Sequence, residues 1–320
     1  MTDFQRYLRA KRSVDDRAID RRLVGLLREQ VTARAQATDG PLRILEIGAG
    51  VGTMVARAVE WDLLPAGEIR YTAVDIEAAN VDALPQHLRE WASERDTAVS
   101  MGGNTAASMG GDTTVSTADS VVLDTPESQI EVDPVAADAV DYAGQTETDY
   151  DLLVGAALLD ILDLDRLDPL LGCLAPGGCY YFPITFDGAT RFRPAHPADS
   201  EVERLYHSHM DRKPGGASQA GGDLLARLQQ RDCGSILGAA GSDWIVRPVD
   251  GAYPGDEAYF LHHLIDGIES AVVDAQRTTG GTTQLAREAV QTWGDRRHRA
   301  VSAETLVYGA HNLDVLAAVP

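Results

Sequence analysis

The residues best suited to chemistry in this chain are a glycine-rich stretch and a carboxylate that follows it. Glycines occupy every second position of Gly48-Ala49-Gly50-Val51-Gly52, between Glu46 and Thr53, and Asp75 stands about 20 to 25 residues further on. Glycine has no Cβ, so a ligand can approach its backbone closely. A carboxylate at the end of the next strand can accept hydrogen bonds from both hydroxyls of a ribose. The pattern predicts a nucleoside site.

The same residues narrow the kind of nucleoside. A dinucleotide fingerprint, G-x-G-x-x-G, requires glycine where Thr53 stands, which argues against NAD and FAD. The stretch also lacks the lysine and hydroxyl residue of a P-loop, and Glu46 places a negative charge beside it. A cationic nucleoside without phosphates, such as S-adenosylmethionine (SAM), fits better. A tight strand-helix turn that binds nothing remains the alternative.

On these residues the chain resembles the class I SAM-dependent methyltransferases. Glu46 to Gly52 resembles the first motif of that family, and Asp75 with Ile76 resembles its ribose-binding position. The resemblance extends over residues 40 to 185 and implies SAM as cofactor and S-adenosylhomocysteine as product. The cofactor-binding residues it implies are Glu46, Gly48, Ala49, Gly50, Gly52, Thr53, Asp75, Ile76, Asp138, Ala139 and Gly155. Asp138 and Ala139 would meet the adenine, although Asp138 is equally suited to cap a helix.

The catalytic candidates are Asp160, Asp187 and His207. SAM carries an activated methyl group, so the protein has to align the acceptor and, for an oxygen acceptor, remove a proton. Asp160 and Asp187 each follow a predicted strand, at the edge where open α/β sheets bind ligands, and either could instead cap a helix. His207 suits proton transfer near neutral pH. His207 and His209 are two residues apart and so point to different helix faces, and we expect no metal site.

The elements that must position these residues follow from hydrophobic periodicity. Helices are predicted over 13–30, 53–61, 81–91, 162–174, 200–210, 224–231, 256–273 and 283–299, and strands over 42–47, 69–74, 130–136, 150–154, 179–185, 244–249 and 305–310. The alternation of strands and helices predicts a Rossmann-like α/β fold, a three-layer sandwich. The resemblance to the class I methyltransferases further implies a seven-stranded sheet that is mostly parallel, with an antiparallel last strand.

Two segments fall outside this pattern. Residues 1–39 are predicted to form an N-terminal helical cap on a methyltransferase domain over residues 40–320. Tyr7, Arg9, Lys11 and Arg12 could fold over the pocket with this cap, or form a solvated basic face. Residues 97–128 are rich in Ser, Thr, Gly and Ala, and are predicted to be a flexible low-complexity insertion, because they cannot bury enough surface to offset their ordering entropy.

Composition limits the partners. The net charge of −21 opposes binding to nucleic acid and to anionic membranes, so we expect neither, and a small molecule is the expected acceptor. Lysine occurs only at positions 11 and 213, a pattern that suggests a halophilic source, or else an arginine-rich proteome. With no apolar leader or membrane span in the sequence, a cytoplasmic location is expected. Three cysteines without a C-x-x-C pair favour neither disulfides nor a zinc site, and a homodimer is compatible with the sequence.

The sequence therefore predicts a SAM-dependent methyltransferase acting on a small molecule, with the acceptor atom, oxygen or nitrogen, left open. One alternative keeps the SAM pocket without catalysis and serves as a binding scaffold. A second is an NAD(P)-dependent oxidoreductase of similar topology, against which Thr53 counts.

Overall fold

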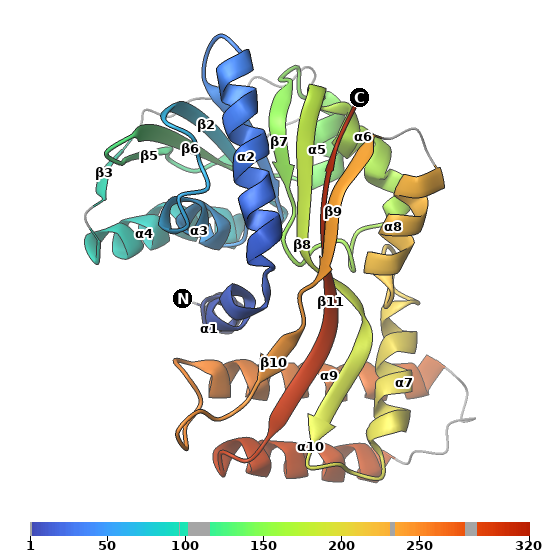
Figure 1. Ribbon diagram of the computed structural model, residues 1–320. Coiled ribbons are helices and arrows are strands. Elements are labelled where there is room, and N and C mark those ends of the chain that lie inside the picture. Colours follow the sequence, from blue (N-terminus) through green and yellow to red (C-terminus); the bar gives the residue numbers. More distant parts are fainter. Residues whose placement is uncertain (1, 96, 102–115, 231–233, 279–286) are drawn as a thin grey trace.

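The computed structural model describes residues 2–95, 97–101, 116–230, 234–278 and 287–320. Its centre is one mixed sheet in the strand order β10-β11-β8-β7-β1-β2-β6-β5-β3, with β4 beside β6 and β9 beside β11 (Figure 1). The strands are β1 (Leu42–Ile47), β2 (Gly67–Asp75), β3 (Ala98–Met101), β4 (Ser116–Thr117), β5 (Val121–Asp124), β6 (Ser128–Ala136), β7 (Tyr150–Val154), β8 (Leu174–Arg193), β9 (Ser235–Gly241), β10 (Trp244–Val246) and β11 (Val307–Ala318).

Five neighbouring strands, β6, β2, β1, β7 and β8, run parallel, and β11 runs antiparallel to both β8 and β9. The first parallel strand in the chain, β1, lies in the middle of these five, so the strand order reverses between β1 and β7. This arrangement confirms the predicted Rossmann-like α/β fold with an antiparallel last strand. Within the described residues the sheet has eleven strands, however, so the expected seven strands describe only its central part.

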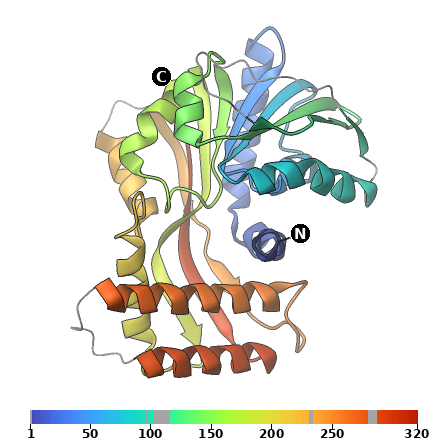
Figure 2. The same cartoon turned by 180° about the vertical axis from the view of Figure 1, so that it is seen from behind.

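Helices cover both faces of the parallel sheet. The helices are α1 (Asp3–Ala18), α2 (Arg21–Ala37), α3 (Thr53–Glu60), α4 (Ala78–Ser93), α5 (Ala139–Gln145), α6 (Leu167–Gly172), α7 (Asp199–Met210), α8 (Ala220–Gln230), α9 (Glu257–Thr278) and α10 (Arg287–Ser302). Apolar residues of α2, α3 and α4 share one buried cluster with the sheet, and those of α5, α6 and α8 share another on the reverse face (Figures 1 and 2). The result is the three-layer sandwich expected from the alternating pattern.

Strands β8 and β11 are much longer than predicted and leave the sandwich together. Their antiparallel pairing extends to Arg193 and Val307, and β10 adds to this lower end. Helices α7, α9 and α10 cover the extension around a third buried cluster that includes Phe192, Phe260 and Trp293. Figure 1 shows this lower part below a waist, where the carboxyl ends of the parallel strands also lie.

The N-terminal helices differ from the single helix predicted over 13–30. The chain forms two helices that separate at Ile19 and Asp20. The Asp20 carboxylate accepts a hydrogen bond from the Leu23 amide and so caps α2, while the Asp20 amide donates to the buried carboxylate of Asp314. These contacts stop α1 and redirect the chain, because they satisfy backbone groups that a continuous helix would use internally.

The predicted flexible insertion also differs from the structure at its ends. Strands β3 and β5 pair with each other, and β5 pairs with β6, so both extend the main sheet. Val121 and Leu123 of β5 are fully buried. We therefore correct the expectation for these ends: their alternating apolar residues bury enough surface to order them, although the overall composition is poor in large apolar residues. Residues 102–115 lie outside the described part of the chain.

Among the described residues, none of the helices combines the length and the apolar character that crossing a membrane requires.

Candidate functional site

The topology itself marks one place in the sheet for a ligand. In open α/β sheets, ligands bind outside the carboxyl ends of the strands, where the strand order reverses. That place lies between β1 and β7, because their helical connections leave toward opposite faces. The predicted glycine turn follows β1, and the segment from Gly155 to Asp160 follows β7. The two predicted motifs thus meet at the switch point.

The glycine turn has backbone angles that require glycine. Gly48, Gly50 and Gly52 have φ values of 67°, 56° and 83°, in the left-handed region that other residues rarely adopt. Neighbours are also close: a Cβ added at Gly48 would lie 2.9 Å from a Leu158 methyl carbon, and one at Gly50 would lie 3.2 Å from a Leu8 methyl carbon. The turn therefore consists of bare backbone, which is largely buried, because apolar side chains such as Leu8 and Leu158 lie against it.

Asp75 holds the turn in place. Its carboxylate accepts hydrogen bonds from the amides of Gly50 (2.7 Å) and Glu77 (2.9 Å), and from the side-chain amide of Asn80 at 3.3 Å. An ionised carboxylate has about four acceptor positions, so one stays available for a hydroxyl donor. Asp75 is thus brought against the glycine turn, as the spacing predicted, and its first role is to fix that turn.

Glu46 lies behind the turn. Its side chain is buried on the sheet face covered by α3, and it accepts a hydrogen bond of 2.7 Å from the Tyr71 hydroxyl on β2. Burial raises the pKa of Glu46 to about 8, against the opposing effects of Tyr71 and of the Arg57 guanidinium. The predicted acidic residue is therefore present beside the site, but in an apolar setting that disfavours its charge.

The remaining predicted cofactor residues surround the same sheet edge. The Ala49 amide donates to the Val74 carbonyl, and Thr53 begins α3. Ile76 is 70% exposed, which leaves its side chain accessible at the end of β2. A Cβ at Gly155 would lie 3.1 Å from both Ile47 and Phe182, so glycine is needed there for packing.

Asp138 acts as a helix cap in this structure. Its carboxylate accepts hydrogen bonds of 3.0 Å from the amides of Val140 and Asp141 at the start of α5, where Ala139 is the first helical residue. Arg166 also lies 3.3 Å away. The capping alternative is therefore present, and it leaves Asp138 and Ala139 at the carboxyl end of β6, beside β2 and Asp75.

A cavity of about 270 Å³ adjoins this sheet edge at the waist. The segment after β7 contributes Asp160 and Ile161, and helices α1, α7 and α9 and the loop that follows α7 supply the other walls. Polar side chains that line it are Tyr7, Asp160, Tyr206, His209, Lys213 and His263. Tyr7 lines the cavity and its neighbour Leu8 contacts the glycine turn, so the cavity and the turn are separated by one helix.

Burial changes the acid-base character of this cavity. It raises the pKa of Asp160, which Lys11 lowers only in part, and it raises the pKa of Tyr206 to about 12. Burial raises the pKa of Tyr7 as well. A carboxylate in such a setting is a stronger base than one in water, because its charged form is less well solvated.

The other two catalytic candidates lie elsewhere. Asp187, in the extension of β8, accepts a hydrogen bond from the Gly222 amide and lies 3.8 Å from His311. His207 contacts the Thr190 hydroxyl at 3.1 Å and the ring of Phe186. Neither belongs to the residues that line the cavity, whereas His209, two positions along α7, does. Of the three predicted catalytic residues, Asp160 therefore lines the cavity, and Asp187 and His207 do not.

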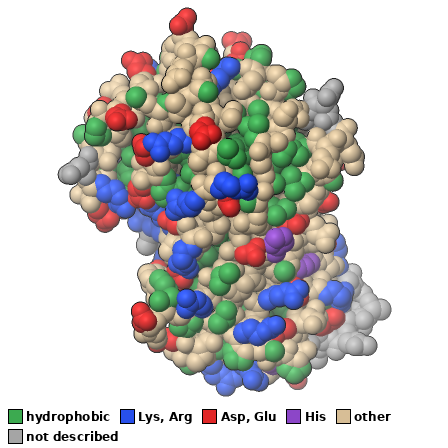
Figure 3. Space-filling view, viewed as in Figure 1, with side chains coloured by type: hydrophobic (Ala, Val, Ile, Leu, Met, Phe, Trp, Pro, Cys, Tyr) green, Lys and Arg blue, Asp and Glu red, His purple; other side chains and the backbone are tan. Residues whose placement is uncertain are grey.

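Helix α1 covers the site, and ion pairs hold it there. Arg57 on α3 contacts Asp16 at 2.5 Å and Asp15 at 3.3 Å, and Trp244 on β10 donates to Asp15 at 3.0 Å. Glu257, which is fully buried at the start of α9, accepts hydrogen bonds from Ser13 and Arg17. Figure 3 shows Lys and Arg side chains along this face of the molecule, over α1 and α2.

The sequence analysis did not predict the contacts that Gln5 and Leu8 make. The Gln5 side chain donates to the Ala79 carbonyl at 2.9 Å, and Leu8 lies against Gly50. The available signal was a capping box, Thr2 with Gln5, which starts α1 much earlier than residue 13.

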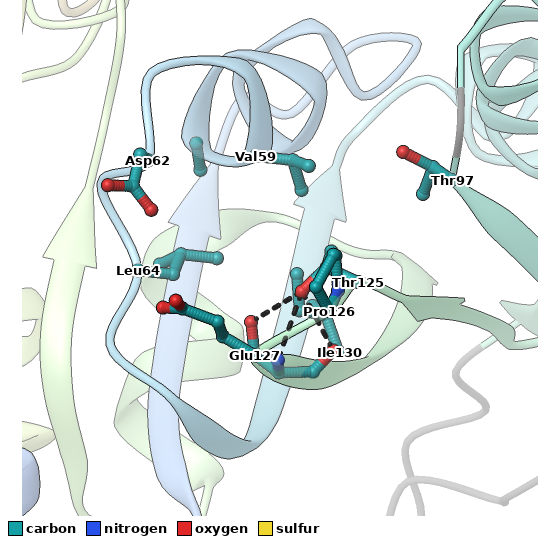
Figure 4. Close-up of a pocket in the computed structure, with 10 residues that line it drawn as sticks. Val59, Asp62, Leu64, Thr97, Thr125, Pro126, Glu127 and Ile130 are labelled. Carbon is teal, nitrogen blue, oxygen red and sulfur yellow. Dashed lines mark hydrogen bonds between the residues drawn. The ribbon is translucent and has the colours of Figure 1, made fainter.

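A second cavity, of about 300 Å³, lies at the opposite edge of the sheet. Val59, Asp62, Leu64, Thr97 and Glu127 are among its lining residues, near the amino ends of β2 and β6 (Figure 4). Hydrogen bonds between Thr125 and Ser128 close the turn between β5 and β6, which forms part of the cavity wall. Because α/β sheets bind ligands at the carboxyl edge, this cavity is not the candidate site.

Comparison with known proteins gave matches among solved structures alone. No protein-family model matches the chain, and no curated protein matches it. A phosphoethanolamine N-methyltransferase of Haemonchus contortus, solved with S-adenosylhomocysteine, is 13% identical with a TM-score of 0.34, over 91% of this chain and 52% of that one. This chain therefore spans about half of that protein.

Two further structures cover more of their own length. A cyclopropane synthase of Mycobacterium tuberculosis is 11% identical with a TM-score of 0.40, over 91% of this chain and 82% of that chain. A SAM-dependent methyltransferase of Thiobacillus denitrificans, solved with S-adenosylhomocysteine, is 12% identical with a TM-score of 0.38, over 92% of this chain and 90% of that chain. At these values the matches establish neither a family nor a substrate for this chain.

Proposed function

We propose that this protein is a SAM-dependent methyltransferase that acts on a small molecule. The observation that carries the proposal is the pairing of a bare-backbone turn with Asp75 at the switch point of the sheet. Asp75 and the backbone of Gly48 to Gly52 would hold the ribose and the amino-acid part of the cofactor, and Ile76 with Asp138 and Ala139 would border the adenine. Bound SAM supplies a methyl group on a positively charged sulfur.

The charge beside the turn favours SAM over a dinucleotide. The Asp75 carboxylate lies next to it, where it would repel a pyrophosphate and attract a cation, whereas Glu46, whose pKa burial raises to about 8, adds little to this effect. Thr53, at the start of α3, also replaces the third glycine that dinucleotide sites use for close helix packing. These features weigh against the NAD(P)-dependent alternative.

Cofactor binding tests the pocket directly. We expect Asp75→Asn to weaken SAM binding by roughly 10-fold or more in isothermal titration calorimetry, because it removes a charged acceptor and loosens the Gly50 amide. Gly50→Leu should weaken it further, since a side chain there strains a left-handed backbone and meets Leu8.

Asp151→Asn is the matched control for this experiment. Asp151 is equally buried and also accepts a backbone hydrogen bond, from Arg43, but it pairs with Arg34 near the amino end of β1. SAM affinity should survive this change. Unaltered affinity in both Asp75→Asn and Gly50→Leu would refute the pocket, and binding of NAD(P) in place of SAM would favour the oxidoreductase.

We further propose that Asp160 is the base that removes a proton from the acceptor. It follows β7, two residues after Leu158, whose side chain lies against the glycine turn, and it lines a cavity of about 270 Å³ whose size suits a small metabolite. Its partly buried carboxyl would take a proton from an acceptor hydroxyl or ammonium, and Tyr7 and Tyr206 would orient the acceptor by ring contact and hydrogen bonds.

Turnover separates this enzyme from a SAM-binding scaffold. With a small-metabolite extract as acceptor source, we expect formation of S-adenosylhomocysteine, and Asp160→Asn should reduce its rate by roughly 100-fold or more while SAM affinity is retained. Asp187→Asn should change the rate little, because Asp187 lies outside the cavity. Absence of product with an intact SAM titration would favour the scaffold, and equal rates for both variants would remove Asp160 from the mechanism.

A further inference from the structure

A cluster of metal-binding residue types lies on two helices of the lower part, apart from the proposed cofactor site. Helix α9 provides Asp266 and Glu269, and α10 provides His298. One donor atom from each residue lies within 4.8 Å of the others. The His298 Nε2 atom is 3.1 Å from an Asp266 oxygen and 3.8 Å from a Glu269 oxygen. Figures 1 and 2 show that α9 and α10 lie side by side.

These separations suit a shared metal ion. Two ligand atoms about 2.1 Å from zinc, at a tetrahedral angle, are about 3.4 Å apart. The measured distances fall on either side of that value. Asp266 is exposed, so water can complete the coordination. An imidazole with two carboxylates is a ligand set that zinc accepts, and calcium or magnesium, which prefer oxygen alone, would gain less from His298.

A second histidine orients the first. The Nδ1 atoms of His262 and His298 are 2.6 Å apart, and their rings are nearly parallel, at an interplanar angle of 14° with centroids 4.9 Å apart. When the Nδ1 hydrogen of His298 is donated to His262, the Nε2 atom of a neutral His298 keeps its lone pair and faces the two carboxylates. Metal-binding histidines are commonly fixed in this way, by a hydrogen bond from the ring nitrogen that does not bind the metal.

Room for Glu269 is provided by a glycine in the middle of α10. A Cβ at Gly294 would overlap the Glu269 carboxylate. Glycine in a helix interior is less stable than alanine, and the backbone of Gly294 is helical, so the backbone conformation does not require it. Its effect here is to let the carboxylate approach α10 beside His298.

We propose that His298, Glu269 and Asp266 form a zinc site that joins α9 to α10, with His262 as a positioning residue. The sequence predicted no metal site, because the ligands stand on two separate helices and no short motif contains them. On α9, His262, Asp266 and Glu269 recur at spacings of four and three, which place them on one helix face.

Zinc titration of the full chain tests the site. After dialysis against a chelator, we expect one saturable equivalent of Zn²⁺ in calorimetry, a higher melting temperature with Zn²⁺, and no competition from equal Ca²⁺. Cobalt in place of zinc should give the visible absorption bands of a low-coordinate site. His298→Gln and Glu269→Gln should lower the affinity for zinc by about 100-fold or more, and His262→Gln should lower it by about 10–100-fold.

The control is His311→Gln. His311 also lies between two carboxylates, but Asp243 faces its Nδ1 atom and Asp187 its Nε2 atom, so the two carboxylates cannot share one ion with it. Zinc binding should be unchanged in this variant. If no saturable equivalent is found, or if it persists in both His298→Gln and Glu269→Gln, the cluster is an ion pair of a charged histidine and the proposal is wrong.

Discussion

At the scale of single residues, Glu46 combines a predicted functional position with an unfavourable setting for charge. Burial raises its pKa to about 8 from the usual value near 4.5. The folded protein therefore holds a proton on Glu46 that the unfolded chain releases. Stability from this group is fully present below pH 4.5 and is lost as the pH rises toward 8.

We predict that Glu46→Gln removes part of this pH dependence. Glutamine keeps an acceptor for the Tyr71 hydroxyl but carries no charge. The variant should gain stability over the wild type, on the order of a few kcal/mol, in denaturant unfolding at pH 8, and little at pH 4.5. Glu68→Gln, at an exposed position on β2, is the control. If the variant and the wild type differed in stability by the same amount at both pH values, the buried charge of Glu46 would not be the cause of the difference.

Site residues could be predicted from the sequence where local spacing fixes them. The glycine turn and Asp75 meet because consecutive parallel strands end at the same edge, which the pattern already implied. Asp187 was predicted by the same reasoning, whereas His207 was predicted only because histidine suits proton transfer; β8 continues past the edge of the sandwich and carries Asp187 away from the cavity. Strand length depends on a partner strand, here β11, which lies far along the chain.

At the scale of elements, the outer strands show where composition misleads. Strands β3 and β5 occur in a segment of small polar residues, yet Leu123 is fully buried against the sheet. We predict that Leu123→Ala lowers the free energy of unfolding by about 2–4 kcal/mol, because it leaves a cavity.

Val122→Ala is the matched control, since Val122 points to the other face and is only partly buried. It should cost less than about 1 kcal/mol under the same salt conditions. Equal and small losses for both variants would mean that this outer part of the sheet contributes little to stability.

At the scale of the whole molecule, the central sheet was predictable and the lower part was not. Alternating strand and helix patterns predict a mainly parallel sheet with helices packed on it, because parallel strands need crossover connections, and these are right-handed. The lower part depends on two long strands that bend out of the sandwich through irregular pairing near residues 310–315. No local pattern encodes such a bend, although α7 and α9, which cover the extended strands, also supply walls of the cavity at the waist.

The indole of Trp244 gives the protein a built-in optical reporter. Its nitrogen donates to Asp15 on α1, and the Lys11 ammonium lies 5.2 Å from its ring centre. Both neighbours belong to the helix that contacts the glycine turn through Leu8. A shift of that helix on ligand binding would change the polarity around this ring. The fluorescence emission of Trp244 should therefore report ligand binding on the opposite side of α1.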